Sequence, residues 1–102
     1  MSAPPFVLLQ THEFQQILSD LSNKPQNRTK YKKVVKTLRL LESVGPRHPG
    51  LQSHLYHSIK GPNGGPLWES YVENNTPSAW RIFWEYGPGE DELTLITVGP
   101  HP

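Results

Sequence analysis

The last third of the chain constrains the fold most, because it contains three short segments rich in aromatic and β-branched side chains. These segments are 67–73, 80–86 and 93–98, and turn-forming residues separate them. Such runs are typical of β-strands, and consecutive strands joined by turns form an antiparallel meander. Arg81 lies in the middle segment, and His101 follows the last one. A meander therefore places a fixed cation near a titratable imidazole, a pairing that suits phosphodiester chemistry.

The middle segment indicates which of its side chains face the core. Side chains along a strand alternate between the two faces of the sheet. Arg81, Phe83 and Glu85 therefore share one face, and the other is entirely apolar or aromatic. We expect the apolar face to pack under helices and Arg81 to lie on the opposite, partly open face. The residues predicted to face the helices are Trp80, Ile82, Trp84 and Tyr86.

The first half of the chain predicts a strand followed by two helices. Residues 6–9 form a short apolar run, and Thr11 can cap a helix that ends near Asn23. A second amphipathic stretch begins at 27–29 and ends before Gly45-Pro46. The predicted order is β-α-α-β-β-β, an α+β fold with a helical hairpin packed on one side of an antiparallel sheet.

Between the helices and the meander the periodicity is lost. Residues 52–59 have only enough pattern for a brief extended stretch, and 61–66 is a glycine- and proline-rich loop. The two adjacent glycines of this loop lack the following lysine and helix of a phosphate-binding loop. We therefore do not expect the loop to bind phosphate.

Length and composition indicate one domain spanning residues 1–102, with a modest core because only 34% of the residues are hydrophobic and eleven are prolines. No apolar run approaches the roughly 20 residues of a membrane span, and no signal-peptide pattern begins the chain. We expect a soluble, cytoplasmic protein that is not exported. The absence of cysteine excludes disulfides and thiolate zinc sites.

The net charge of +1 conceals a strong polarity along the chain. Residues 1–60 carry nine lysines and arginines against three acids, a balance of +6, whereas the remainder carries Arg81 against six acids, a balance of −5. A basic half of this kind can supply a surface for nucleic acid. The alternative is a solvated helix face combined with acidic turns.

The five histidines do not predict a metal site. His54 and His57 are three residues apart, but no carboxylate or third histidine follows at a ligand spacing, so we predict neither metal nor cofactor. Metal-free cleavage of RNA instead needs a base, a cation and an acid. Arg81 and His101 suit two of these roles. The alternatives are an ion pair of Arg81 with Glu69 or Glu85, and a terminal position without a role for His101.

Several segments together resemble the RelE/ParE superfamily of toxins from type II toxin-antitoxin systems, and in particular the RelE- and YoeB-like messenger RNA interferases. That resemblance implies two helices followed by an antiparallel sheet, which agrees with the order of elements given above. The segments that carry it are Leu55-Tyr56-His57-Ser58-Ile59-Lys60-Gly61, Leu67-Trp68-Glu69-Ser70, Trp80-Arg81-Ile82-Phe83-Trp84 and Leu95-Ile96-Thr97-Val98-Gly99-Pro100-His101.

The resemblance also implies roles for individual residues. Arg81 matches the arginine that stabilises the transition-state phosphate, and His101 matches a C-terminal histidine that acts as general acid. YoeB-like members have a glutamate base where this chain has Ser53-His54, so we infer from chemistry that His54 or His57 is the base. The residues expected to contact phosphates or bases are Lys60, Tyr71, Lys32, Lys33 and Lys36.

Two departures from the family pattern stand out. Glu69-Ser70-Tyr71 occupies a strand where many relatives carry basic residues, and this weakens the expected phosphate site. The chain also ends His101-Pro102, without the tyrosine that often follows the histidine in relatives.

From these observations we predict a ribosome-dependent endoribonuclease that cleaves messenger RNA, inhibits translation and is bound by a cognate antitoxin. A second reading is a ParE-like or catalytically degenerate member that acts by binding DNA gyrase or the antitoxin, and Glu69-Ser70-Tyr71 favours it. A third is an RNA-binding domain without chemistry.

Overall fold

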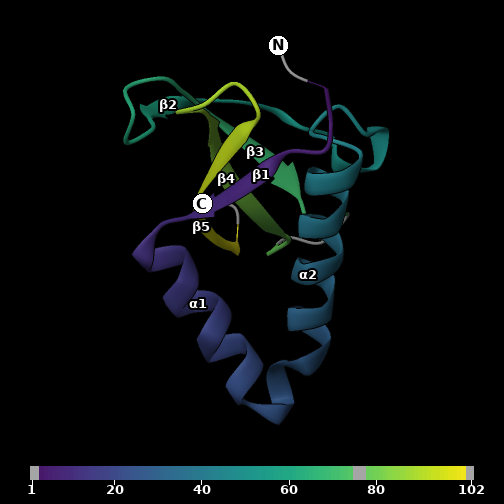
Figure 1. Cartoon of the computed structure of the whole chain (residues 1–102). Coiled ribbons are helices and arrows are strands. Elements are labelled where there is room, and N and C mark those ends of the chain that lie inside the picture. The colour runs from purple at the N-terminus through teal and green to yellow at the C-terminus, as the bar shows by residue number, and fades with distance from the viewer. Residues whose placement is uncertain (1–2, 75–77, 101–102) are drawn as a thin grey trace.

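A sheet with two helices packed against one of its faces makes up the computed structural model, which describes residues 3–74 and 78–100, without the side chains of 57–59 (Figure 1). Both helices start or end at the sheet and meet at the far end of the molecule. The described elements, in chain order, are β1 (Val7–Gln10), α1 (His12–Asn23), the 3-10 turn η1 (Pro25–Asn27), α2 (Arg28–Ser43), the 3-10 turn η2 (Pro49–Leu51), β2 (His54–Lys60), β3 (Pro66–Tyr71), β4 (Trp80–Tyr86) and β5 (Glu92–Pro100).

The sheet has the strand order β1-β5-β4-β3-β2. Strands β2 to β5 form the antiparallel meander, and β1 adds to β5 in parallel. The predicted α+β fold with a helical hairpin on one face is thus confirmed. The sheet differs from the prediction in being mixed, because the N-terminal strand returns to pair beside the C-terminal one.

Strand β2 is the element that the sequence did not resolve. Residues 52–59 are expected to extend only briefly, but His54–Lys60 forms a full strand, so in the described part of the chain four strands follow the helices rather than three. Its sequence, HLYHSIK, is too polar to show a buried face, and the strand lies at the edge of the sheet. Antiparallel pairing with β3, with His54 opposite Glu69, holds this segment in a strand although its own sequence has no strong strand pattern.

Both predicted helix boundaries are confirmed. The Thr11 hydroxyl accepts a hydrogen bond from the Phe14 amide at 3.1 Å and donates one to the Ile96 carbonyl at 2.7 Å, so the same residue begins α1 and attaches it to β5. At the end of α2, Gly45 adopts a φ of +98°, and its amide donates to the Leu40 carbonyl.

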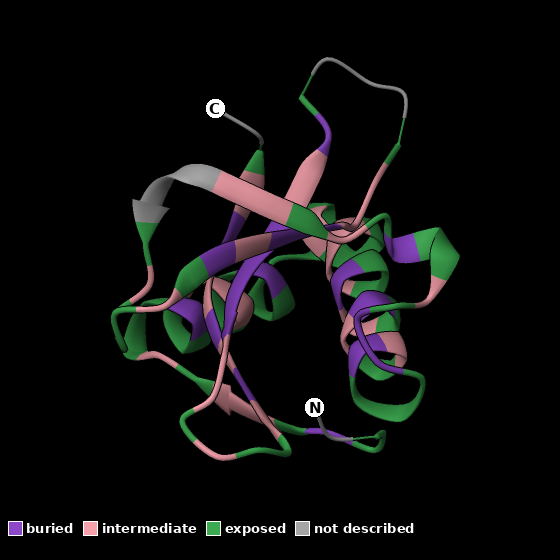
Figure 2. Cartoon of the chain, turned by 90° about the horizontal axis from the view of Figure 1, so that it is seen from above, coloured by how far each residue is buried: buried purple, intermediate pink, exposed green. Residues whose placement is uncertain are grey.

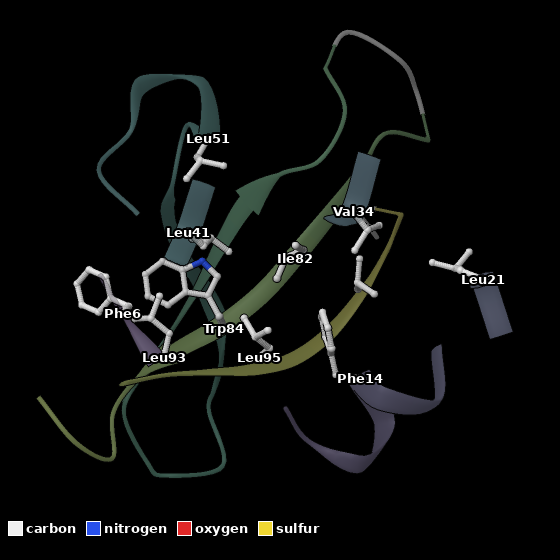
Figure 3. Close-up of a cluster of buried hydrophobic side chains, with 11 residues drawn as sticks. Phe6, Phe14, Leu21, Val34, Leu41, Leu51, Ile82, Trp84, Leu93 and Leu95 are labelled. Carbon is white, nitrogen blue, oxygen red and sulfur yellow. The ribbon is translucent and has the colours of Figure 1, made fainter. Parts of the chain in front are cut away.

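The hydrophobic core lies between the helices and the sheet, where Trp84 of β4 is fully buried (Figure 3). Trp80 and Tyr86 are partly buried against this core, as the strand alternation predicted. In Figure 2 the central strands are mostly buried or half-buried, while both helices expose one side. The other buried members of the cluster are Phe6, Phe14, Leu21, Val34, Leu41, Leu51, Ile82, Leu93, Leu95 and Val98.

Within the ranges that the structure describes, neither helix combines the length and the apolar character needed to cross a membrane.

Candidate functional site

The candidate site lies on the face of the sheet that points away from the helices, which we call the open face. Strand register decides its members, because residues paired across strands share a face. His54 pairs with Glu69, Glu69 with Phe83, and Tyr71 with Arg81. These side chains therefore belong to one surface that spans β2, β3 and β4.

Arg81 is held in a fixed position on this face, with only 12% of its side chain exposed. Its guanidinium carbon lies 3.7 Å from the centre of the Tyr71 ring, which is a close cation–π contact. The Nη1 atom donates to the backbone carbonyls of Glu73 at 3.3 Å and Trp80 at 3.4 Å. Because Nη1 makes both bonds, the Nη2 donors are left for a ligand as far as the described residues are concerned.

The Nε atom of Arg81 lies 4.0 Å from Glu69 Oε1, and it is buried without a hydrogen-bond partner among the described residues. The ion pair with Glu69 that the sequence offered as an alternative role is thus present as a long contact. The other alternative, Glu85, is occupied elsewhere, because its carboxylate accepts hydrogen bonds from the amides of Asn63 at 3.0 Å and Gly65 at 2.7 Å.

Glu69 makes a short contact with His54. The two meet at 2.6 Å, from Nε2 of the ring to Oε1 of the carboxylate, and Glu69 is almost completely buried whereas 47% of the His54 side chain is exposed. The other ring nitrogen, Nδ1, lies 2.8 Å from the Gln52 carbonyl. A carbonyl can only accept, so Nδ1 carries a proton, and a further proton lies between Nε2 and Glu69.

Tyr71 joins the two halves of the site. The face of its ring contacts Arg81, and the ring is T-shaped to that of His54, with the ring centroids 5.9 Å apart and the planes at 70°. Tyr71 thus contacts both the imidazole and the guanidinium on the open face.

A hydrogen-bonded pair beneath the site attaches it to the core. The hydroxyls of Ser53 and Ser70 are 2.7 Å apart, and the indole of Trp84 donates to Ser70 at 2.8 Å. Ser53 and Ser70 precede and follow the His54–Glu69 pair in sequence, so this buried link fixes the edge strand that carries His54.

Helix α2 holds the far end of β3 through Glu73. The carboxylate contacts the ammonium groups of Lys30 at 2.7 Å and Lys33 at 3.1 Å, and it accepts from the Trp80 amide at 3.2 Å. The hydrogen bond from Lys30 is the largest of the effects that lower the pKa of Glu73 to about 2, and partial burial opposes them. Since the Glu73 carbonyl also accepts from Arg81, this ion-pair cluster fixes the backbone that orients the guanidinium.

Two cavities flank the site. An apolar cavity of about 360 Å³ on the open face has Phe83 and Leu67 in its lining and Lys60 among its few polar groups. A second, more polar cavity of about 610 Å³ lies between α2, η2 and the end of β3, and its lining includes Lys36, His48 and Tyr71. Tyr71 thus borders the cavity on the helix side as well as the site on the open face.

The structure brings three of the predicted site residues together, namely His54, Tyr71 and Arg81. Lys60 borders the apolar cavity, Lys33 is paired with Glu73, and Lys36 lines the polar cavity. Lys32 lies apart from these, in hollows on the outer side of α2.

Two predicted residues remain outside this description. The side chain of His57 and the whole of His101 lie beyond what the structure describes. The described part of β5 ends at Pro100, whose partner in the register is Trp80, next to Arg81.

Glu69 is the residue whose role the sequence misjudged. The sequence indicates it as a negative charge where a positive one is expected and as an alternative ion-pair partner of Arg81, but the structure also places it against the imidazole of His54. Strand alternation already placed it on the same side as Tyr71. The missing signal was β2, because His54 can be seen to face Glu69 only once that strand is recognised.

Among the described residues, no three histidine or acidic side chains come together in a way that would hold a metal ion.

The architecture, two helices packed on a five-stranded mixed sheet, is that of the RelE-like toxin fold. The chain matches neither a protein-family model nor a curated protein in sequence. The likeness to solved structures is close to full length but low in identity, so it confirms the predicted resemblance as a matter of fold.

Three solved structures illustrate that likeness. The YoeB dimer from Staphylococcus aureus has a TM-score of 0.68 at 9% identity, over 96% of this chain and 99% of that one. RelE in the archaeal RelE–RelB complex from Pyrococcus horikoshii OT3 gives 0.63 at 9% identity, over 94% of each chain. The YoeB/ParE toxin from Agrobacterium tumefaciens gives 0.62 at 14% identity, over 93% of this chain and 98% of that one.

Proposed function

We propose that the chain is the toxin of a type II toxin-antitoxin system and cleaves messenger RNA on the ribosome without a metal ion. The observation that carries this proposal is the convergence of His54, Tyr71 and Arg81 on the open face of a RelE-like sheet. A fixed cation, a titratable ring and an aromatic surface are the groups needed to bind and cleave a phosphodiester.

In the proposed reaction a histidine base, His54 or His57, takes the proton of a ribose 2′-hydroxyl. The 2′-oxygen then forms a bond to phosphorus, and the bond from phosphorus to the 5′-oxygen breaks. Arg81 stabilises the charge on the phosphorane oxygens, and His101 gives a proton to the departing 5′-oxygen. The products are a 2′,3′-cyclic phosphate and a 5′-hydroxyl, so no redox step or cofactor is needed.

The lysines would supply affinity rather than chemistry. Lys60 lines the apolar cavity and Lys36 the polar one, and both would contact phosphates of messenger or ribosomal RNA. Lys32 and Lys33 would extend this surface along α2. Phosphate contacts of this kind strengthen binding without selecting a sequence. The expected protein partner is a cognate antitoxin, as RelB is for the archaeal RelE in its complex.

Mapping of messenger RNA 5′ ends in a translating extract tests this proposal. The wild type should leave ribosome-dependent cuts, and Arg81→Ala and His101→Ala should reduce them by about 10²- to 10³-fold each. His12→Ala, which removes an exposed histidine at the start of α1, is the matched control and should cut normally. A wild type that leaves no cuts refutes the nuclease, and mutants that cut normally refute the residue assignments.

One observation favours a second function, that of a toxin acting by protein binding alone. Both ring nitrogens of His54 and one edge of Arg81 already have partners within the chain, and Glu69 offsets part of their charge. A degenerate member could keep these groups for structure and bind DNA gyrase or the antitoxin. Inhibition of gyrase supercoiling by a wild type that leaves no messenger RNA cuts would support this alternative.

A further inference from the structure

The buried carboxylate of Glu69 is the group in the site to which the proposed reaction assigns no role. It faces His54 at 2.6 Å and Arg81 at 4.0 Å, and it is almost completely shielded from water. Burying a carboxylate costs several kcal/mol unless charged partners and hydrogen bonds compensate. Because its carboxylate is hydrogen-bonded to the imidazole, the position of Glu69 bears directly on where the His54 ring carries its protons.

We propose that Glu69 is the positioning residue of the site, because it keeps a proton on Nε2 of His54 and thereby reserves Nδ1 as the base. This inference rests on the proposed function for its catalytic meaning, but the placement of the proton can be measured without RNA. A carboxylate that fixes the tautomer of a histidine base is an effective device in other hydrolytic enzymes.

The hydrogen bonds dictate this assignment. In the resting site Nδ1–H donates to the Gln52 carbonyl, so the ring has no free lone pair. When the ring gives up one proton, it can keep the other on either nitrogen. The Glu69 carboxylate is an anionic acceptor and holds the proton on Nε2 more strongly than a neutral carbonyl holds it on Nδ1. The lone pair is then on Nδ1, which belongs to the exposed part of the residue.

Without Glu69 the preference reverses. The Gln52 carbonyl would be the remaining acceptor for the ring, and the proton would settle on Nδ1. The lone pair would then lie on Nε2 and point into the space that Glu69 occupies, where no substrate can reach. Loss of the carboxylate therefore leaves His54 in place with the wrong nitrogen protonated.

Nδ1 becomes available when the substrate hydroxyl replaces the Gln52 carbonyl. Gln52 is the described non-glycine residue with a left-handed backbone, at a φ of +46°, and it lies at the junction between η2 and β2. A residue held in that region stores strain, so a small backbone movement at the junction can withdraw the carbonyl. The contact between Nε2 and Glu69 need not break during this exchange.

The charged and titratable groups that face His54 come from two other strands. Glu69 and Tyr71 belong to β3, and Arg81 of β4 acts through Glu69. Among these described groups, Glu69 is the one hydrogen-bonded to a ring nitrogen of His54. Its replacement by the isosteric amide is therefore the decisive change.

The first experiment records the long-range proton–nitrogen NMR spectrum of the histidine rings in the protein alone, with the His54 signals assigned from His54→Gln. In the wild type Nε2 should carry a proton across neutral pH. In Glu69→Gln the amide can donate to Nε2 while Nδ1–H keeps its bond to Gln52, so Nε2 should lose its proton. Glu69→Asp, which keeps the charge on a shorter side chain, should restore the wild-type pattern in part.

Glu85→Gln is the matched control, because Glu85 is equally buried on the same face but is held by loop amides. It should leave the His54 spectrum unchanged. An Nε2 that keeps its proton in Glu69→Gln overturns the proposal.

The second experiment measures cleavage by the folded variants. Glu69→Gln should lower kcat at least about 10-fold with KM within about twofold, since the base is misprotonated while the binding groups remain. An unchanged kcat together with the reversed tautomer overturns the catalytic part of the inference. If the wild type does not cleave RNA but the tautomer reverses as expected, the placement of the proton by Glu69 stands and the proposed nuclease fails.

Discussion

Two buried glutamates, Glu69 and Glu85, lie on the same face of the sheet and are equally shielded from water, but they have opposite kinds of partner. Glu85 is held by the backbone amides of the loop between β2 and β3, at Asn63 and Gly65. Glu69 is held by the ring of His54 at the edge of the sheet, beside Arg81. One end of the open face therefore closes a loop, and the other holds a titratable imidazole beside a guanidinium.

The difference shows that burial of an acid does not by itself indicate a reactive site. Backbone amides cannot give up their protons, so Glu85 can only hold the loop in one shape. Close packing supports this reading, since a Cβ added at Gly65 would lie 2.8 Å from Glu85 Oε2 and one at Gly61 would clash with the same carboxylate. A histidine partner, in contrast, has a second nitrogen to offer to a substrate.

The largest expected effect is on stability, and it tests the contrast between the two glutamates by replacing each of them in turn with alanine. Glu85→Ala leaves two loop amides without an acceptor, and we expect it to lower the free energy of unfolding by about 2 to 4 kcal/mol. Glu69→Ala should cost only about 1 kcal/mol, because His54 is half exposed and can be solvated. Urea unfolding of both variants gives the two values.

For RNA cleavage, the two alanine variants should show the opposite order of effects. Glu85→Ala should keep its activity per folded molecule, whereas Glu69→Ala should lose it. Equal losses of stability, or equal losses of activity, would show that the two glutamates do not differ in the way described here.

Most of the fold could be predicted from the sequence because its elements have strong local signals. Thr11 caps the start of α1 through its side chain, and Gly45 ends α2 with a left-handed backbone. In 80–86, the alternation of side chains predicts which residues lie on each face of the sheet. The edge strand β2 and the parallel return of β1 have no such signal. Both depend on pairing with distant parts of the chain, which local pattern cannot reveal.

The site was predictable to the extent that single residues were conspicuous. Arg81 stood out as a cation among aromatics, and Tyr71 and His54 were identified as candidates, although not as neighbours. The contact between His54 and Glu69 joins residues 15 positions apart on strands β2 and β3. Because β2 was not recognised, Glu69 was interpreted as a misplaced charge or as a partner of Arg81, and not as the residue that holds the imidazole.

A third acid, Glu73, extends the comparison of the glutamates, because its partners are lysines. Its expected effect on stability is of intermediate size. The hydrogen bond from Lys30, assisted by Lys33, lowers the pKa of Glu73 to about 2 from an ordinary value of 4.5. A lowered pKa stabilises the fold above about pH 4.5, and this contribution is lost as the pH falls toward 2. After allowance for the partial exposure of both lysines, we expect about 1 kcal/mol.

Urea unfolding at pH 6 and pH 3 measures this contribution in the wild type and in Glu73→Gln. The amide variant should be less stable at pH 6 and should lose less stability between the two pH values, by about 1 kcal/mol. If acid weakens both proteins equally, the ion-pair cluster does not contribute to the stability of the fold.

The smallest expected effect concerns two lysines of α2, one paired with an acid and one not. Lys33 is paired with Glu73, whereas Lys36, one turn further on, lines the polar cavity without an ion pair among the described residues. Lys36→Ala should lower the salt dependence of ribosome binding by about one phosphate contact. Lys33→Ala should lower it less, because Glu73 already competes for that ammonium group. Titration of ribosomes at several salt concentrations measures both effects. Lys24→Ala, which replaces an exposed lysine just before the 3-10 turn η1, is the control. A larger change for Lys33→Ala than for Lys36→Ala would contradict the assignment of Lys36 to RNA.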